Sequence, residues 1–173
     1  MKRTKKIALT AALSALALAF SYVEFLIPFD LIGVPGIKPG FANLVVMAAL
    51  YMLGLPYAAL ISAIRILLSF LLFGNLTSLL YSLAGGALSL AVMFALKKLR
   101  AFGEVGVSVA GAAVHNVAQT AVAAALTASG AILWYLPVLL LSAVLFGTVN
   151  GLLLKAIIKR TKNLFKTKTG SDG

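Results

Sequence analysis

The chain is divided into apolar stretches of the length that crosses a lipid bilayer, and this pattern excludes most soluble folds. Residues 7–27, 76–96 and 131–158 are three of these stretches. A membrane-spanning helix needs about 20 mainly apolar residues, and helices satisfy their own backbone hydrogen bonds inside lipid. Charged residues make up only 11% of the chain, whereas soluble proteins carry about 25%. The sequence therefore predicts an all-α integral membrane protein.

Turn residues separate six such segments. Glycine, proline or charged residues end each one, as at Gly54-Leu55-Pro56, which breaks a helix. We expect a six-transmembrane-helix bundle with spans at 7–27, 40–53, 57–73, 76–96, 104–128 and 131–158. The second is short. Residues 1–160 would form one membrane domain, and the basic segment 161–173 a disordered tail.

The positive charges predict the orientation in the membrane. Of the 15 Lys and Arg residues, all but Lys38 and Arg65 lie within 2–6, 97–100 and 155–168, which flank apolar stretches. Basic residues favour the cytoplasmic side, so an even number of spans places both termini there, in a multi-pass protein of the cell membrane. This placement also argues against nucleic acid as the partner of a chain with net charge +11. The alternative is a cleaved signal peptide ending near residue 19.

Several kinds of chemistry are excluded by composition. The chain has no cysteine, one histidine and four acidic residues. These numbers argue against thiolate chemistry, a multi-ligand metal site and paired catalytic carboxylates. There is no Gly-Lys-Ser/Thr phosphate loop for nucleotide hydrolysis. We predict a protein that is not an enzyme and has no cofactor or metal.

Arg65 is the strongest anomaly, since it lies in the middle of the third apolar stretch. An arginine at that depth costs a few kcal/mol and usually faces a polar cavity or a partner. Its planar guanidinium matches carboxylate and phosphate groups, so one interpretation is an anion ligand. The other is a structural ion pair with Glu24 or Asp30, or a side chain that reaches an interface.

The fifth stretch carries a polar stripe. His115 and Gln119 are one helical turn apart, and Asn116 neighbours Gln119 and Thr120. Polar side chains in a span face the bundle interior. The stripe therefore either contacts a ligand or forms hydrogen bonds between helices.

Further polar residues are candidates on weaker grounds. Asn43 and Asn150 lie in the second and sixth stretches, and Glu24 near the outer end of the first. Lys38 belongs to a Gly- and Pro-rich loop, residues 28–39, that we expect to cover the mouth of the bundle. Each of these residues is either a ligand contact or a packing residue.

Small residues form two helix faces. Ala11, Ala15 and Ala19 recur every four residues in the first stretch, which suits docking of another helix. In the fourth stretch, Ser82, Gly85 and Ser89 share one side, and close helix packing is the favoured interpretation.

Four segments resemble a small bacterial family, the Gx transporter or heptaprenyl diphosphate synthase component I family. They are ALALAFSYVE (15–24), GIKPGFAN (36–43) with the following VVMAAL, LYSLAGGALSL (80–90) and AVHNVAQ (113–119). That family is similar to the S components of energy-coupling-factor (ECF) transporters, which bind a solute from the outer side and dock onto a transmembrane partner with ATPases.

The resemblance implies a function and a set of residues. The implied protein binds a small solute, with an isoprenoid, quinone or flavin connection, and docks through the alanine face at Ala11, Ala15 and Ala19. The alternative is a membrane anchor or accessory subunit for a redox or prenyl-lipid (heptaprenyl diphosphate or menaquinone) system. A cavity between the polar residues would favour the first function, and their mutual hydrogen bonding the second. We expect the solute to be bound by Arg65, His115, Asn116, Gln119, Asn43, Glu24 and Lys38.

Overall fold

The computed structural model describes residues 3–27, 38–100 and 102–169, with side chains as far as Thr161, and every regular element in these residues is a helix. In chain order the elements are α1 (Arg3–Leu26), α2 (Phe41–Met52), α3 (Leu55–Leu72), α4 (Leu76–Leu99), α5 (Glu104–Thr127), the 3-10 helix η2 (Gly130–Tyr135) and α6 (Leu136–Thr169). The predicted all-α class is confirmed for these residues, and the predicted helix positions agree closely with the observed ones.

Five segments are long and apolar enough to cross a membrane: α1, α3, α4, α5 and the segment Gly130–Thr161. They support a multi-pass membrane protein. The sixth helix, α2, has 12 residues, which at about 1.5 Å per residue is about 18 Å and shorter than the bilayer core of about 30 Å. The six-span count therefore stays a prediction, and it depends on α2.

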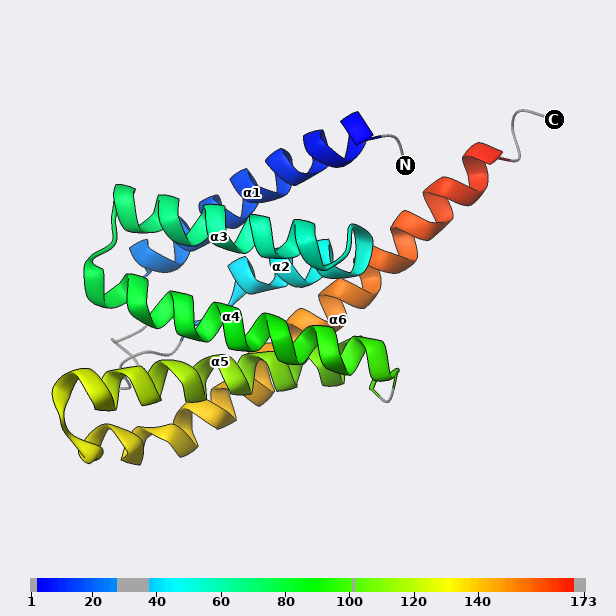
Figure 1. Ribbon diagram of the computed structural model, residues 1–173. Coiled ribbons are helices and arrows are strands. Elements are labelled where there is room, and N and C mark those ends of the chain that lie inside the picture. The colour runs from blue at the N-terminus through cyan, green and yellow to red at the C-terminus, as the bar shows by residue number, and fades with distance from the viewer. Residues whose placement is uncertain (1–2, 28–37, 101, 170–173) are drawn as a thin grey trace.

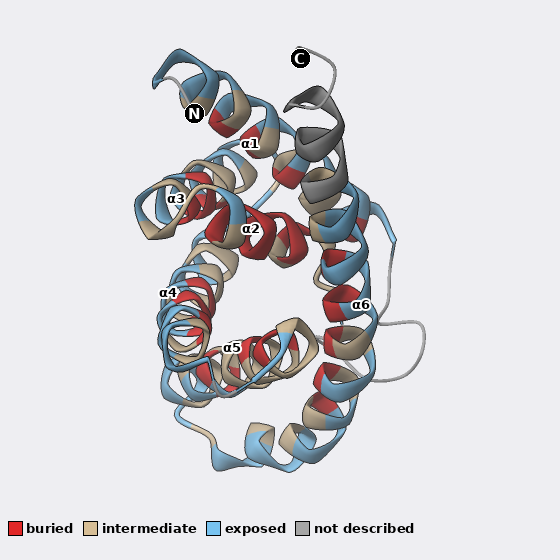
Figure 2. Cartoon of the chain, turned by 90° about the vertical axis from the view of Figure 1, so that its right-hand side faces the viewer, coloured by how far each residue is buried: buried red, intermediate tan, exposed pale blue. Residues whose placement is uncertain are grey.

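Helix α2 is the core of the bundle. Residues Leu44–Leu50 are all buried, and Figure 2 shows α2 almost entirely buried, whereas the other helices expose their outward sides. A helix that is apolar all round is stable only when neighbours surround it. Helix α2 contacts α1, α3, α4 and α6, which satisfies this requirement.

Small residues bring α5 and α6 into close contact. A Cβ atom on Gly151 would lie 2.5 Å from the Cα atom of Val105, and one on Gly147 would lie 2.8 Å from the Cα atom of Val109. These neighbours are backbone atoms, so the two glycines of α6 set its distance from α5.

The two described ends of the chain lie at the same end of the bundle. Figure 1 shows the start of α1, the end of α4 and the end of α6 together at one end. The basic segments at 3–6, 97–100 and 155–160 therefore share that end. This arrangement agrees with the charge argument, while the side of the membrane stays a prediction.

One difference concerns the C-terminal tail. Helix α6 runs on to Thr169, so the backbone of residues 161–169 is helical where the sequence predicted disorder. Lysine and leucine are good helix formers, and a basic composition does not by itself exclude a helix.

Candidate functional site

A cavity of about 350 Å³ lies inside the bundle. Its walls come from the C-terminal parts of α1 and α3, the N-terminal parts of α2 and α4, the middle of α5 and the first half of α6. These wall segments lie in the half of the bundle away from the basic end (Figure 1). The volume is within the range of about 300–1,000 Å³ that small-molecule sites occupy.

The structure brings all seven predicted site residues to this one cavity. These seven residues, which line the cavity together with others, are Glu24, Lys38, Asn43, Arg65, His115, Asn116 and Gln119. They come from four helices and from the segment that precedes α2. Residues that are far apart in the sequence therefore share one polar space.

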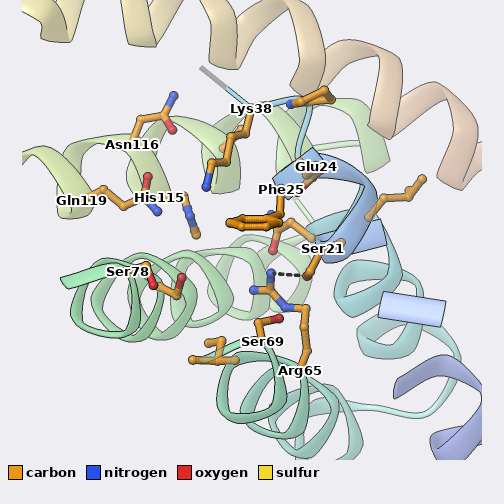
Figure 3. A pocket seen from close by; sticks show the side chains of 18 of the residues that line it. Ser21, Glu24, Phe25, Lys38, Arg65, Ser69, Ser78, His115, Asn116 and Gln119 are labelled. Carbon is orange, nitrogen blue, oxygen red and sulfur yellow. Dashed lines mark hydrogen bonds between the residues drawn. The ribbon is translucent and has the colours of Figure 1, made fainter. Parts of the chain in front are cut away.

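Arg65 points its guanidinium into this space from α3 (Figure 3). Its Nη1 donates to the Ser21 hydroxyl at 3.5 Å, which is a long hydrogen bond. Its Nε is buried and has no hydrogen-bond partner among the described residues. No hydrogen bond joins Arg65 to Glu24 in the described part of the chain, and Asp30, the other predicted partner, lies outside it.

Glu24 has a different partner. Its Oε1 accepts a hydrogen bond from the backbone N–H of Phe41, the first residue of α2, at 2.6 Å. Gly40, at the N-cap position of α2, has no side chain that could make this bond. A carboxylate is favoured at a helix N-terminus because it pairs with unsatisfied N–H groups and the helix dipole. Glu24 therefore lines the cavity and also caps α2.

The polar residues of α5 have two roles, since some line the cavity and some bond to a neighbouring helix. Asn116 donates to the carbonyl of Leu139 at 2.7 Å, which joins α5 to α6, and Thr120 bonds the carbonyl of Asn116 at 2.8 Å. His115 lies against Gly85 of α4, where an added Cβ would be 2.8 Å from its Cε1. The His115 Nδ1 is buried without a partner in the described residues. His115 and Gln119 thus line the cavity, while Asn116 lines it and also joins helices.

Asn150 positions the chain that leads into α2. Its Nδ2 donates to the carbonyls of Pro39 at 2.9 Å and Gly40 at 3.4 Å. Its Oδ1 has no partner among the described residues, and Asn150 lines the cavity. The sequence identified Asn150 as inward and polar but did not predict this contact.

Sequence reasoning missed several wall residues. Ser21 is one, although it lies three residues before Glu24 and so on the same helix face. Serines from α3, α5 and α6 also line the cavity: Ser69, Ser108 and Ser142. Ser78 and Ser82 of α4 line it as well, although the sequence favoured close helix packing for their side of the helix. Four phenylalanines of the wall were not predicted either: Phe25, Phe70, Phe73 and Phe146. The sequence does not show whether an apolar side chain in a membrane span faces a cavity or the lipid.

The small-residue faces differ in exposure. Gly85 and Ser89 are buried on α4, in agreement with close packing. Ala11, Ala15 and Ala19 are all exposed on α1, so no other described part of this chain covers them. The predicted lid loop is residues 28–39; residues 28–37 lie outside the described residues, which include Lys38 and Pro39.

The cavity wall carries charged and hydrogen-bonding side chains. No group of three or more His, Asp or Glu side chains in the described residues could hold a metal ion. One guanidinium, one ammonium, one carboxylate, one imidazole and several amides and hydroxyls face the cavity. These groups can bind a polar solute by charge and hydrogen bonding.

Comparison with known proteins identifies the family. Neither the curated proteins nor the solved structures contain a match to this chain. The family model described as heptaprenyl diphosphate synthase component I matches residues 13–157. The match runs from the middle of α1 into α6 and includes every residue of the cavity wall. The chain is therefore a membrane protein of the heptaprenyl diphosphate synthase component I family.

Proposed function

We propose that this chain is the solute-binding subunit of a membrane transport system, resembling an ECF S component. The observation that carries the proposal is the polar cavity, whose walls hold Arg65 and His115 with nitrogen atoms that have no partner among the described residues. Buried polar groups in proteins are nearly always hydrogen-bonded. A bound solute would supply the missing partners.

The alternative is a membrane anchor for a redox or prenyl-lipid enzyme. An anchor needs no internal cavity, and its buried polar groups would be expected to bond one another. Among the described wall residues, such a bond is the long one from Arg65 to the Ser21 hydroxyl at 3.5 Å, whereas Asn116 bonds a backbone carbonyl. The open volume beside Arg65 and His115 favours solute binding.

The position of the cavity supports binding from the outer side. The cavity lies in the half of the bundle away from the basic segments at 3–6 and 97–100. If these segments face the cytoplasm, the cavity is nearer the outer surface. The exposed face at Ala11, Ala15 and Ala19 would then be free to dock a transmembrane partner.

The cavity volume limits the solute. About 350 Å³ is near the lower end of the range for small-molecule sites. A compact molecule, or the headgroup of a larger one, fits such a space. A complete heptaprenyl chain does not, so an isoprenoid solute would leave most of its chain outside.

Native mass spectrometry of the full chain, purified gently from its own membranes, tests the proposal. The wild type is expected to carry a small molecule. Ala112 lines the cavity on α5, whereas Ala121 on the same helix is exposed. Ala112→Phe should fill the cavity and release the molecule, and the matched control Ala121→Phe should keep it.

The opposite results are equally clear. A wild-type chain with no small molecule, found with a redox or prenyl-lipid enzyme, would support the anchor and contradict the transport proposal. A molecule that remains bound to Ala112→Phe would show that it binds elsewhere on the protein.

A further inference from the structure

Arg65 has more hydrogen-bond donors than the described residues use. A guanidinium carries five N–H donors, and its partner among these residues is the Ser21 hydroxyl at 3.5 Å. The Nε is buried and unpaired within the same part of the chain. Burying a charge is costly unless it is paired and hydrogen-bonded. An oxyanion in the cavity would accept from these donors in the fork geometry that arginine favours.

The charged side chains of the described wall also favour an anionic solute. Arg65 and Lys38 are the cations on the described wall, and Glu24 is the carboxylate. Glu24 already accepts from the N–H of Phe41. The described wall therefore carries one net positive charge, which a solute with an anionic group would balance.

The remaining wall is suited to an apolar body. Phe25 and Phe73 form an aromatic pair with ring centroids 5.1 Å apart, and both line the cavity with Phe70 and Phe146. In Figure 3 the Phe25 ring lies among the polar side chains that point into the same space. The cavity volume of about 350 Å³ is also far larger than a small inorganic ion requires, since even a water molecule takes up only about 30 Å³.

Together these observations identify a class of solute. We infer that the cavity binds a small organic anion whose carboxylate or phosphate group is held by Arg65, with Lys38 at the rim and the apolar body of the solute against the phenylalanines. The inference rests on the proposed function, because it concerns the solute of the same cavity.

Four small probes test the inference on the detergent-purified full chain. Benzoate and phenyl phosphate carry an anion on a ring, benzamide is the neutral counterpart, and acetate lacks the ring. The readout is the shift in Tm at constant ionic strength, because a ligand that binds only the folded state raises Tm. Benzoate or phenyl phosphate should raise Tm by a few degrees, while benzamide and acetate should have little effect. A response to benzoate alone indicates a carboxylate, and one to phenyl phosphate alone a phosphate.

Variants connect the response to the residues. Arg65→Gln should lower the apparent affinity for the responding probe about tenfold or more. Lys98→Gln removes an exposed charge at the basic end and should respond as the wild type does. If Arg65→Gln does not fold, Lys38→Gln at the exposed rim should still weaken the response by a smaller factor.

Several outcomes overturn the inference. They are an equal response to benzamide, an unchanged response in Arg65→Gln or Lys38→Gln, and no response of the wild type to either anion. A neutral molecule found by native mass spectrometry would overturn the inference and leave the proposed function standing. A chain with no bound molecule in that experiment would contradict the proposed function itself.

Discussion

The carboxylate of Glu24 accepts a hydrogen bond from the backbone N–H of Phe41 at 2.6 Å, so that α1 caps the N-terminus of α2. This bond connects the C-terminal part of α1 to the most buried helix of the bundle. It also holds a negative charge at the wall of the cavity, which Arg65 and Lys38, the cations that we expect to bind the solute, line as well.

Removing this cap is expected to destabilise the fold. Glu24→Ala leaves the Phe41 N–H without its acceptor, and loss of a capping side chain costs about 0.5–2 kcal/mol. Glu24→Gln retains a carbonyl acceptor and should lose less. Thermal unfolding in detergent, followed by circular dichroism, measures the difference. Glu104→Gln, at the first turn of α5 and outside the cavity, is the matched control. If Glu24→Ala unfolds at the wild-type temperature, the bond does not stabilise α2.

Gly85 is expected to determine where His115 lies. In Gly85→Ala the new Cβ would lie 2.8 Å from Cε1 and 2.9 Å from Nδ1 of His115, so the imidazole must move. Overpacking of this kind costs about 1–3 kcal/mol, and both Tm and the retention of the bound solute should fall. Thermal unfolding and native mass spectrometry measure the two effects.

Two further variants test whether the effect of Gly85→Ala comes from a clash with His115 or from replacing a glycine by alanine in general. Gly103→Ala is the control, because a Cβ added there would have nothing within 4 Å and the φ of Gly103 is −70°. The double variant Gly85→Ala with His115→Ala should recover stability relative to the sum of the two single changes. Strict additivity would mean that the two residues do not clash.

The sequence predicted the helices and the polar wall because both depend on local pattern. Apolar length and turn residues located the helices, and the cost of burying Arg65 identified it as a cavity or pairing residue. The stripe at His115 and Gln119 followed from helical spacing. All of them could be found without knowing which helices are neighbours.

The contacts that the sequence missed depend on how the helices pack. Asn150 bonds the carbonyl of Pro39, 111 residues away, and Glu24 caps a helix that begins 17 residues later. Helical spacing shows that Asn116 and His115 are both inward. It does not show that α6 passes close enough to accept a bond from Asn116. These roles require the tertiary arrangement.

The alanine face of α1 is expected to dock a transmembrane partner if the transport proposal is correct. Ala11, Ala15 and Ala19 are exposed, and small residues allow two helices to approach closely. Ala15→Leu should reduce co-purification of the partner from native membranes while the solute remains bound. Ala87→Leu, on an exposed position of α4, is the control. Unchanged co-purification in Ala15→Leu would remove the docking interpretation.

The final prediction concerns whether the chain crosses the membrane at α2. This helix begins at the cavity, where Glu24 caps it, and ends beside α4, where the Nζ of Lys97 donates to the carbonyl of Leu50 at 2.7 Å. Lys97 belongs to a basic segment, so the end of α2 lies at the basic end of the bundle. If the chain crosses the membrane here, Lys38 and the end of α2 lie on opposite sides of it.

Single cysteines can decide this, since the chain has none of its own. Lys38 and Pro56 lie on either side of α2, and both are exposed. A membrane-impermeant maleimide applied to intact cells should label Lys38→Cys, whereas Pro56→Cys should react only after permeabilisation. Ala131→Cys and Lys98→Cys, exposed on either side of α5, provide the outer and inner references. Labelling of Lys38→Cys and Pro56→Cys from the same side would mean that α2 does not cross the membrane, and it would contradict the six-span prediction.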